Sequence, residues 1–282
     1  MSADRVPFTQ KLLNLQVQRG PLSVGIDPHP FQLEQWGLAD TPTGVRQFAE
    51  SMASAAIAAN VASVKLQAAF FERHGSAGVA VLEETLGTLR AAGVLTILDA
   101  KRGDIGTTME AYAQSCLQPG SPLEADAVTV SPFLGYGSLA PAIELAGEHQ
   151  RGVYVLALTS NPEAASIQDV GAPSIAQRLI ERAEHDNNSV NLQGVVGLVI
   201  GATTAGRLAH LEPHLATFGG SILAPGVGAQ GATPRSLACT FAHSRSQLVV
   251  PISRAVAETG PDVAQLVSRI GELNQDLGLA LL

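Results

Sequence analysis

The stretch VLTILDAKRGDIGTT, residues 94–108, decides the fold. It begins with a short apolar run of the kind that forms a buried strand, and it ends in a turn that leads toward a helical segment. Between these two parts stands an Asp-x-Lys-x-x-Asp cluster made of Asp99, Lys101 and Asp104. A strand that gives way to charged residues and then to a helix is typical of one βα unit with functional groups at the strand end.

Seven other runs have the same apolar, β-branched character and are bounded by Gly, Pro or Asp. They are residues 22–27, 61–66, 126–131, 152–160, 194–202, 221–226 and 247–253. Ala- and Leu-rich segments with helical spacing lie between them, for example 45–59, 79–92 and 173–185. Eight strands that alternate with helices predict an α/β fold, a (β/α)8 TIM barrel, although an open doubly wound sheet also fits the periodicity. No linker or change of composition divides the chain, so we expect a single barrel domain over residues 1–282.

The composition excludes several classes of function. A net charge of −8 opposes binding to nucleic acid, because a polyanion would be repelled. No apolar run approaches the ~20 residues that span a bilayer, and the start MSADRVPFTQ lacks the apolar stretch of a signal peptide. Cys116 and Cys239 lie far apart in Ala- and Leu-containing segments, which suits reduced thiols. We therefore expect a cytoplasmic protein that binds neither membrane nor nucleic acid.

Polar residues close or follow most of the expected strands. In a barrel, the active site gathers at the carboxyl ends of the strands. The residues at those ends are Asp27, Lys65, Asp99, Lys101, Ser131, Thr159, Ser160 and Arg254. Their shared place in the topology indicates an active site more strongly than any one of them alone.

Only three of the 17 basic residues are lysines, and two of these, Lys65 and Lys101, lie in or beside strand-like runs. Lysine can release a proton in a protein, whereas arginine cannot, so both positions suggest chemistry. Alternating residues of a strand point the same way, which places Asp99 and Lys101 on one side, where Lys65 would meet Asp99. Each residue also has a structural interpretation. Lys65 can extend along apolar surface to water, and Asp27 and Asp104 can be acids of turns.

A glycine-rich segment, GVGAQG at 226–231, follows the seventh expected strand. It satisfies G-x-G-x-x-G, but no Asp or Glu occurs in residues 213–257, so the acid that a dinucleotide site needs for the ribose is missing. The same stretch contains Arg235, Arg245 and Arg254, and barrels often bind phosphate in this sector. These features favour a phosphate-binding loop over a flexible turn. The seven histidines form no recognisable ligand set, so we expect no metal site.

These motifs together resemble those of the orotidine 5′-phosphate decarboxylase family. DAKRGDIGTT (99–108) fits that family's Asp-x-Lys-x-x-Asp-Ile-x-x-Thr pattern at every defined position, and PGVGAQG (225–231) is similar to its phosphate loop. The Asp-x-Lys-x-x-Asp core is shared with related sugar-phosphate enzymes, whereas the Ile-x-x-Thr extension and the loop are more specific. The resemblance spans nearly the whole chain. It implies decarboxylation of orotidine 5′-phosphate to UMP in pyrimidine biosynthesis, with no cofactor.

The resemblance also implies catalytic roles. Lys101 would give a proton to C6 of the pyrimidine, and Asp99 would lie against the departing carboxylate. Lys65 would orient Asp99 and the ribose, and Asp27 would bind a ribose hydroxyl. This array of alternating charges would stand ready before the substrate arrives.

Further implied roles concern the substrate's other groups and a second subunit. Asp104, which counts with the catalytic residues, would reach into the neighbouring subunit's site together with Ile105 and Thr108, so an obligate homodimer with shared active sites is implied. Four residues would hold the substrate in their own subunit: Ser160 at the base amide, Gln230 and Arg254 at the phosphate, and Pro225 beside them. Ser253 stands where the family usually has Gly. The insertions 28–44 and 161–172 indicate a longer-chain subgroup.

Two other functions are alternatives. A metal-dependent sugar-phosphate decarboxylase or synthase of the same suprafamily would need Mg²⁺ and further carboxylate ligands, and EDTA would abolish its activity. A non-catalytic phosphate-binding barrel would leave the absorbance of orotidine 5′-phosphate unchanged. The leading hypothesis predicts turnover that survives EDTA.

Overall fold

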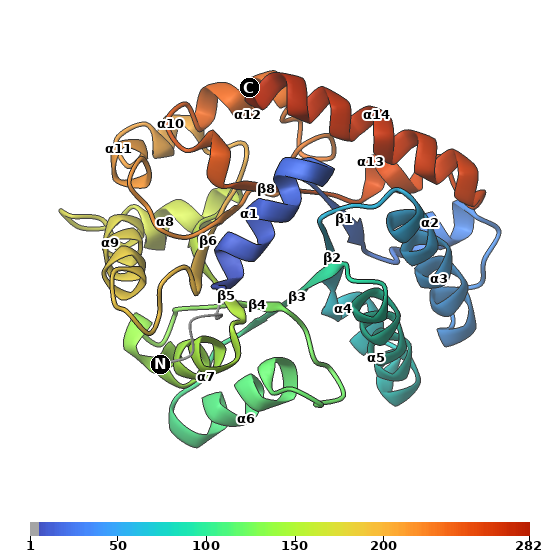
Figure 1. The fold of residues 1–282 in the computed structure, drawn as a ribbon, viewed down its shortest axis with the longest axis horizontal. Helices are drawn as coiled ribbons and strands as arrows, with labels where there is room; N and C mark the ends of the chain where they lie inside the picture. The colour runs from blue at the N-terminus through green and yellow to red at the C-terminus, as the bar shows by residue number, and fades with distance from the viewer. Residues whose placement is uncertain (1–5) are drawn as a thin grey trace.

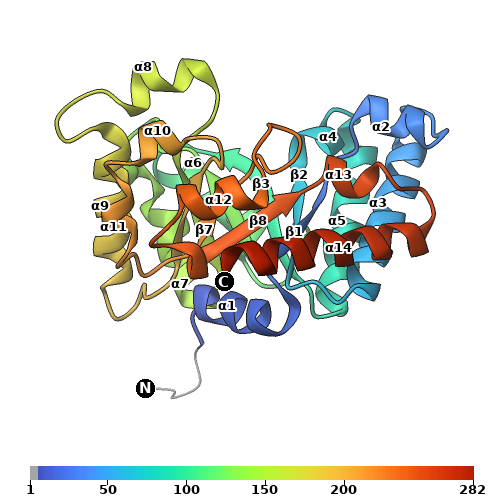
Figure 2. The same cartoon turned by 90° about the horizontal axis from the view of Figure 1, so that it is seen from above.

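Eight parallel strands close into a barrel in which each strand pairs with the next and β8 pairs with β1 (Figures 1 and 2). The structure is a computed structural model and describes residues 6–282. The strands are β1 Leu22–Ile26, β2 Ser63–Gln67, β3 Leu95–Arg102, β4 Ala127–Val130, β5 Gly152–Leu158, β6 Val196–Ile200, β7 Ile222–Leu223 and β8 Leu248–Ile252. Each of the eight expected strand runs overlaps one of these strands. The TIM barrel is thereby confirmed, and the open doubly wound sheet is excluded.

Helices alternate with the strands and surround the barrel (Figure 1). The α-helices are α1 Phe8–Arg19, α2 Pro30–Gln35, α3 Pro42–Ala58, α4 Ala68–Glu72, α5 Gly75–Ala91, α6 Gly106–Leu117, α7 Ala140–His149, α8 Ala165–Gln168, α9 Ile175–Asn187, α10 Ala205–Leu208, α11 Glu212–Leu215, α12 Pro234–Thr240, α13 Arg254–Ala257 and α14 Val263–Leu281. Three 3₁₀ turns are η1 Tyr136–Leu139, η2 Pro162–Ala164 and η3 Arg245–Gln247. Across residues 6–282, no helix is both long and apolar enough to cross a bilayer.

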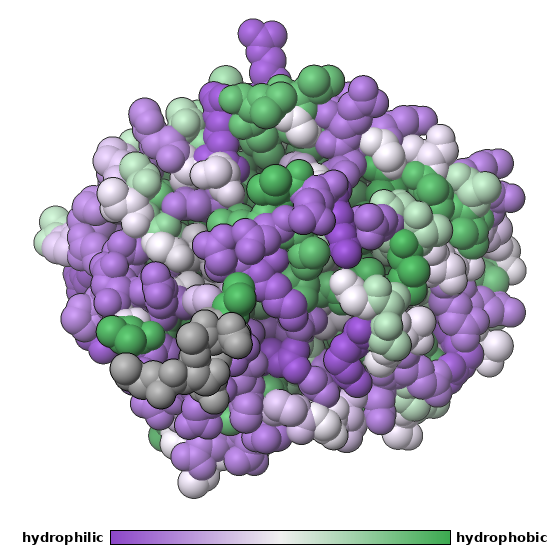
Figure 3. Space-filling model, in the orientation of Figure 1, coloured by the Kyte–Doolittle hydropathy of each residue, from purple (hydrophilic) through white to green (hydrophobic). Residues whose placement is uncertain are grey.

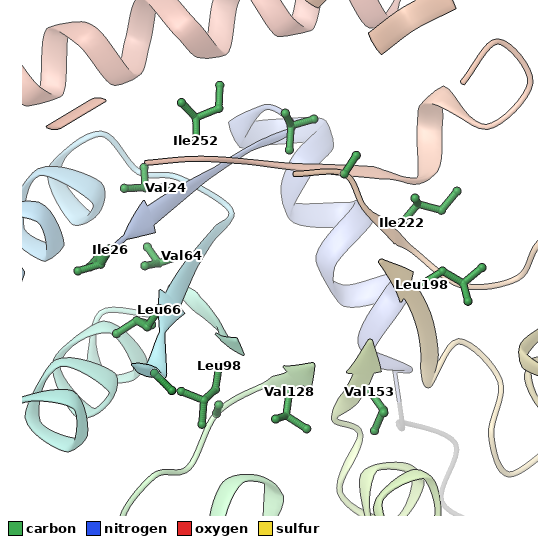
Figure 4. Close-up of a cluster of buried hydrophobic side chains, with 14 of the residues drawn as sticks. Val24, Ile26, Val64, Leu66, Leu98, Val128, Val153, Leu198, Ile222 and Ile252 are labelled. Atoms are coloured by element: carbon green, nitrogen blue, oxygen red, sulfur yellow. The ribbon is translucent and has the colours of Figure 1, made fainter. Parts of the chain in front are cut away.

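The outward faces of the strands form the larger hydrophobic core. Val24, Ile26, Val64, Leu66 and Leu98 belong to this core and are almost fully buried. Figure 4 shows these side chains between the strands and the surrounding helices. Because helices cover this face and the barrel interior covers the other, the strands are apolar on both sides, except for β1 and β2, whose inward residues are polar or glycine. This explains why the strand sequences read as continuous apolar runs.

The inward faces form a second core near the amino ends of the strands, and helix α1 closes that end. Phe8 and Leu12 of α1 are buried in this core, and the ring of Phe8 meets Tyr154 edge to face at a centroid distance of 6.1 Å. A side chain at Gly152 would clash with the ring of Phe8, so glycine is needed where α1 approaches β5. Figure 2 shows α1 below the barrel. Figure 3, taken from that side, shows hydrophilic side chains mixed with small hydrophobic patches.

The opposite, carboxyl end of the barrel carries the longer loops. The insertion 28–44 forms α2 and the first turn of α3, and the insertion 161–172 contains η2 and α8, which project above the barrel (Figure 2). Along β3 the inward side chains change from Ile97, in the inner core, to Asp99 at the strand end. Along this strand the apolar filling thus gives way to a charged group at the carboxyl end, which positions a site there.

Candidate active site

The carboxylate of Asp99 is the centre of a hydrogen-bonded charge cluster at the carboxyl end of the barrel. Its Oδ2 accepts from Lys65 Nζ and from Gln67 Nε2, both at 3.0 Å. Its Oδ1 accepts from Lys101 Nζ at 2.6 Å and from Thr129 Oγ1 at 2.8 Å. Strands β2, β3 and β4 supply these groups, and the register places Gln67 directly beside Asp99. Four donors thus fix one buried carboxylate in a single orientation.

Lys65 connects this carboxylate to a second one. Its ammonium lies 3.5 Å from Asp27 Oδ1, just beyond the end of β1, and 3.0 Å from Asp99 Oδ2. The structural interpretation of Lys65, a stem that extends to water, is wrong, because its side chain is buried and paired on both sides. The order of charges across the barrel mouth is therefore Asp27, Lys65, Asp99 and Lys101.

Lys101 reaches Asp99 from a distorted part of β3. Its backbone φ is 47°, in the left-handed region that a non-glycine residue rarely adopts. The register between β3 and β4 shifts between Leu98 and Arg102, and the N–H of Lys101 donates to Thr129 Oγ1 at 3.0 Å. Such a conformation costs about 1–3 kcal/mol and is found where it serves a function. The Lys101 side chain remains 46% exposed, so its ammonium faces both Asp99 and the open mouth.

The charges of this cluster hold one another in their ionised forms. Burial opposes ionisation of Asp99, but the charges of Lys65 and Lys101 and the hydrogen bonds from Lys101 and Thr129 outweigh it, so the pKa of Asp99 lies well below its usual range. Burial likewise acts to lower the pKa of Lys65, but the carboxylates of Asp27 and Asp99 raise that pKa above its usual value. At neutral pH these two side chains are therefore an ammonium and a carboxylate.

The lowered pKa of Asp99 predicts a loss of stability in acid. Above the unfolded-state pKa of about 3.9, the ionised carboxylate contributes its full stabilisation. As the pH falls toward the folded-state pKa, the unfolded chain binds a proton that the folded chain does not, and this stabilisation is lost. We therefore compare the free energy of unfolding of the wild type with that of Asp99→Asn. The difference, wild type minus variant, should decrease as the pH is lowered below 4, by at most about 1.4 kcal/mol per pH unit. Urea titrations at pH 7, 5, 4 and 3 measure this difference, and a constant value from pH 5 to 3 would contradict the ionised state assigned to Asp99.

A pocket of about 450 Å³ opens over the charge cluster. The sequence-predicted residues that line it are Asp27, Lys65, Asp99, Lys101, Thr159, Ser160, Pro225, Gln230 and Arg254. Its remaining walls include apolar side chains from several strands, such as Leu156, Val199 and Leu223. A mostly apolar hollow with a few convergent charged groups is typical of a small-molecule site.

The glycine-rich loop forms the side of the pocket away from the lysines. Gly226, Gly228 and Gly231 all have positive φ angles, which explains the repeated glycine in this segment. The amides of residues 228–232 donate to carbonyl oxygens within the same loop. A short loop closed on itself thus uses its own amide donors, which are the groups that a phosphate-binding loop commonly offers to an anion. The side chain of Gln230 faces the pocket instead and accepts from Ser160 Oγ at 2.8 Å.

Of the three arginines in the acid-free stretch, only Arg254 lines the pocket. Arg235 lines a separate groove beside α12, and Arg245 donates to the carbonyl oxygen of Ala238 at 3.0 Å. Beside Arg254, the Ser253 side chain fills the space next to Gly25, where an added Cβ would lie 2.7 Å from the Cβ of Ser253. The serine is thus accommodated by a glycine on the neighbouring strand.

Asp104, Ile105 and Thr108 lie outside this pocket. They occupy the turn after β3 and the first turn of α6, with Ile105 as much as 62% exposed. Oδ1 of Asp104 accepts from the N–H of Ile105 at 2.8 Å, and the helix start has no side-chain cap. The structure therefore separates these three residues from the charge cluster of their own chain.

Sequence reasoning missed several residues that belong to the site. Gln67 and Thr129 both donate to Asp99. Each lies two residues along its strand from another inward residue, so strict strand alternation could have predicted that both side chains point into the barrel. Ser131, expected at the fourth strand end, instead lines a neighbouring groove. His29 also lines the pocket, with its ring tilted against that of Phe70 at a centroid distance of 4.2 Å, and burial and the charge of Arg254 lower its pKa. It lies in the insertion 28–44, where the sequence pattern assigned no role.

The chain is similar to known proteins over nearly its whole length. Residues 20–268 match the orotidine 5′-phosphate decarboxylase / HUMPS family. The orotidine 5′-phosphate decarboxylase of Corynebacterium glutamicum (strain R) is 48% identical over 276 residues, which cover 95% of this chain and 97% of that protein. The enzyme of the same name from Salinispora tropica is 48% identical over 277 residues, with 97% and 98% covered.

Solved structures give the same result. The crystal structure of a putative orotidine 5′-phosphate decarboxylase from Streptomyces avermitilis superimposes with a TM-score of 0.91 at 43% identity, covering 100% of this chain and 99% of that one. The OMP decarboxylase of Leishmania donovani superimposes with a TM-score of 0.78 at 30% identity, covering 98% and 99%. Both similarities extend over the barrel and its loops.

Proposed function

The chain belongs to the orotidine 5′-phosphate decarboxylase / HUMPS family and converts orotidine 5′-phosphate to UMP in pyrimidine biosynthesis, and we propose that Asp99 and Lys101 carry out the chemical step. The single observation that carries this proposal is the contact between Lys101 Nζ and Asp99 Oδ1 at 2.6 Å, in the mouth of the barrel. It sets a proton donor beside a fixed negative charge.

In the proposed reaction the bond between C6 and the carboxylate carbon breaks, CO₂ leaves, and the electron pair remains on C6. Lys101 stabilises the developing charge and gives its proton to C6, which forms the new C–H bond. Asp99 lies against the substrate carboxylate, so the charge repulsion between them is relieved as CO₂ departs. The exposed end of Lys101 supports this role, because it can contact a substrate in the pocket.

The other residues of the charge array would hold the reacting groups in place. Lys65 fixes Asp99 and reaches toward the ribose, and Asp27 accepts from a ribose hydroxyl. The contacts of Lys65 with both carboxylates support this arrangement. Since neighbouring charges are ionised and fixed beforehand, little reorganisation is needed when the substrate binds. No electron-sink cofactor is assigned a role in this mechanism.

The pocket wall formed by the glycine-rich loop would bind the phosphate and the base. Arg254 and Gln230 hold the phosphate, with Pro225 beside them, and Ser160 contacts the base amide. All four residues line the same pocket as Lys101, which supports a substrate that spans it. Binding of the remote phosphate can then contribute to the reaction at C6.

The proposed function is tested by product analysis. Purified protein incubated with orotidine 5′-phosphate should form UMP and release one CO₂ for each UMP, as measured by chromatography and by trapping of the gas. No UMP above the protein-free control would refute the function.

We also propose that two copies of the chain form a dimer in which Asp104, Ile105 and Thr108 complete the partner's site. The turn that contains Ile105 lies beside the loop after β4, where the N–H of Ser131 donates to the Arg102 carbonyl oxygen at 2.7 Å. That loop exposes 77% of Phe133 and 53% of Leu134. Exposed apolar side chains on adjacent loops support an interface, because a second copy would bury them.

Mixing of two inactive variants tests the shared site. In a hybrid of Lys101→Ala and Asp104→Ala subunits, one site keeps both Lys101 of its own chain and Asp104 of the other. Random reassociation should therefore restore about a quarter of the wild-type rate of orotidine 5′-phosphate turnover. A mixture of Lys101→Ala and Asp99→Ala is the matched control and should restore none, because both residues act within one chain. Failure of the first mixture, with hybrid dimers verified by mass spectrometry, would refute the shared site.

Two further assignments complete the proposal. We place the enzyme in the cytoplasm, which is supported by two free cysteines, Cys116 and Cys239. We treat residues 1–282 as one domain, because the elements from α1 to α14 pack on one barrel, while residues 1–5 lie outside the described part of the chain.

A further inference from the structure

The side chain of Arg207, in α10, ties the insertion 161–172 to the barrel. The guanidinium of Arg207 contacts Asp169 in a bidentate pair, with Nε and Nη2 each 2.8 Å from a different carboxylate oxygen. Nη2 also donates to Gln168 Oε1 at 3.2 Å, and Nη1 donates to the carbonyl oxygen of Thr159 at 2.7 Å. Arg207 therefore joins the segment after β6 to the chain on both sides of the insertion, at Thr159 just before it and at Gln168 and Asp169 near its end.

These contacts immobilise Thr159, the residue before Ser160. The Gln168 side chain accepts from the Thr159 N–H at 2.8 Å and donates to Thr159 Oγ1 at 2.9 Å. The carbonyl oxygen of Thr159 is bound by Arg207. The backbone donor, the backbone acceptor and the hydroxyl of Thr159 are thus all bound, by the insertion on one side and by Arg207 on the other.

Ser160 is fixed in turn. A Cβ added at Gly201, at the end of β6, would lie 3.2 Å from both the Cβ and the backbone N of Ser160, so this backbone is packed closely against its neighbour strand. From this position Ser160 Oγ donates to Gln230 Oε1 at 2.8 Å, across the pocket. The contact joins the base-binding side of the proposed site to the phosphate-binding loop.

We propose that Arg207 is a positioning residue, which sets Ser160 against the substrate base and against Gln230 by clamping the insertion 161–172 through Gln168, Asp169 and Thr159. This inference rests on the proposed function, in which Ser160 and Gln230 bind the substrate. It gives a role to an insertion for which the sequence motifs offered none. Arg207 does not line the pocket, so it acts through Thr159 and does not touch the substrate.

A clamp of this kind should matter for activity more than for stability. The side chains of Arg207 and Asp169 are 25% and 39% exposed, and ion pairs in such places contribute little to folding. A displacement of about 1 Å in a substrate-contacting group, in contrast, can reduce activity about 100-fold. A merely structural role would change stability and activity together.

The experiment compares orotidine 5′-phosphate turnover in Arg207→Ala, Asp169→Asn and Arg178→Ala. We expect kcat/KM to fall about 10- to 100-fold in Arg207→Ala, mainly through a higher KM, and by less in Asp169→Asn, which keeps one hydrogen-bond acceptor. Arg178→Ala is the matched control, because Arg178 donates to Pro173 just beyond the insertion but makes no hydrogen bond to Thr159. It should stay within about twofold of the wild type, with a similar Tm in all three variants.

A double-mutant cycle with Ser160 separates positioning from general loosening. If Arg207 acts through Ser160, then Arg207→Ala introduced into Ser160→Ala should reduce kcat/KM by less than about twofold further. If the reductions in kcat/KM caused by the two substitutions multiply in the double variant, as independent effects do, the proposal is overturned. An Arg207→Ala enzyme with wild-type kcat/KM would overturn it too. A Ser160→Ala enzyme with wild-type kcat/KM would overturn it as well.

Amide hydrogen exchange of the free protein tests the clamp without measuring the reaction. Amides in 157–170 should exchange faster in Arg207→Ala than in the wild type and in Arg178→Ala. Faster exchange in Arg207→Ala, together with a wild-type protein that forms no UMP, would reject the proposed function but leave the clamp intact. Unchanged exchange in Arg207→Ala would reject the clamp itself.

Discussion

Lys101→Ala should lower kcat for orotidine 5′-phosphate by about 10⁴-fold or more while the barrel stays folded. Loss of a positioned proton donor alone typically costs about 10²- to 10⁴-fold, and Lys101 is also the cation that faces the charge developing on C6. No other described lysine can substitute within the pocket, because Lys65 is buried between Asp27 and Asp99. Initial rates from the loss of substrate absorbance measure the effect.

The matched control is Lys11→Ala, since Lys11 is the third lysine of the chain and lies on α1 at the closed end of the barrel. Its Nζ is 3.8 Å from Asp126 and far from the pocket lining. This variant should keep the wild-type kcat. UMP should still bind to Lys101→Ala within about tenfold of the wild-type affinity, because most contacts to the product remain. A kcat for Lys101→Ala within tenfold of the wild type would refute its role as the acid.

Asp99→Asn should lower kcat by about 10³-fold or more without a proportional rise in KM. Two like charges 4 Å apart repel by about 4 kcal/mol at an effective dielectric of 20, which corresponds to about three decades of rate. This repulsion between Asp99 and the substrate carboxylate disappears in the variant. An asparagine also has one acceptor atom where Asp99 accepts from four donors, so Lys65 and Lys101 lose their fixed positions.

The pattern of the two kinetic constants separates this role from general damage. If Asp99 raises the energy of the bound substrate, its neutral replacement should bind orotidine 5′-phosphate as tightly as the wild type or more tightly. Asp276→Asn, on the exposed side of α14, is the control and should leave both constants unchanged. A variant Asp99→Asn whose loss lies only in KM would contradict the proposed repulsion.

The fold was predictable because every strand carries apolar residues on its outward face, and all but β1 and β2 carry them on the inward face as well. The sequence patterns of all eight strands and of the helices α3, α5 and α9 identified the βα repeat to within a few residues at each end. Closure of the barrel could not be predicted, because periodicity describes each strand by itself. It is shown by the pairing of β8 with β1, in which Leu22 lies beside Val250.

The site was predictable where it follows strand alternation and not where the backbone departs from it. Asp99 lies where strand alternation places it. Lys101, in contrast, lies in a register shift of β3 and has a positive φ, and no residue pattern predicted either feature. At the fourth strand, the inward residue is Thr129, and the more obvious serine two positions later lies in another groove. Long-range contacts such as Ser160 with Gln230 join segments 70 residues apart and require the folded chain.

That this charge array removes the carboxylate without a metal or other cofactor is tested most directly by turnover after metal removal. The wild type and Lys101→Ala are each dialysed against EDTA, and the initial loss of orotidine 5′-phosphate absorbance is recorded for both. We expect the wild type to keep its full rate and the variant to fall to about the protein-free background. A wild-type rate that disappears with EDTA and returns with Mg²⁺ would contradict a mechanism built on Asp99 and Lys101 alone.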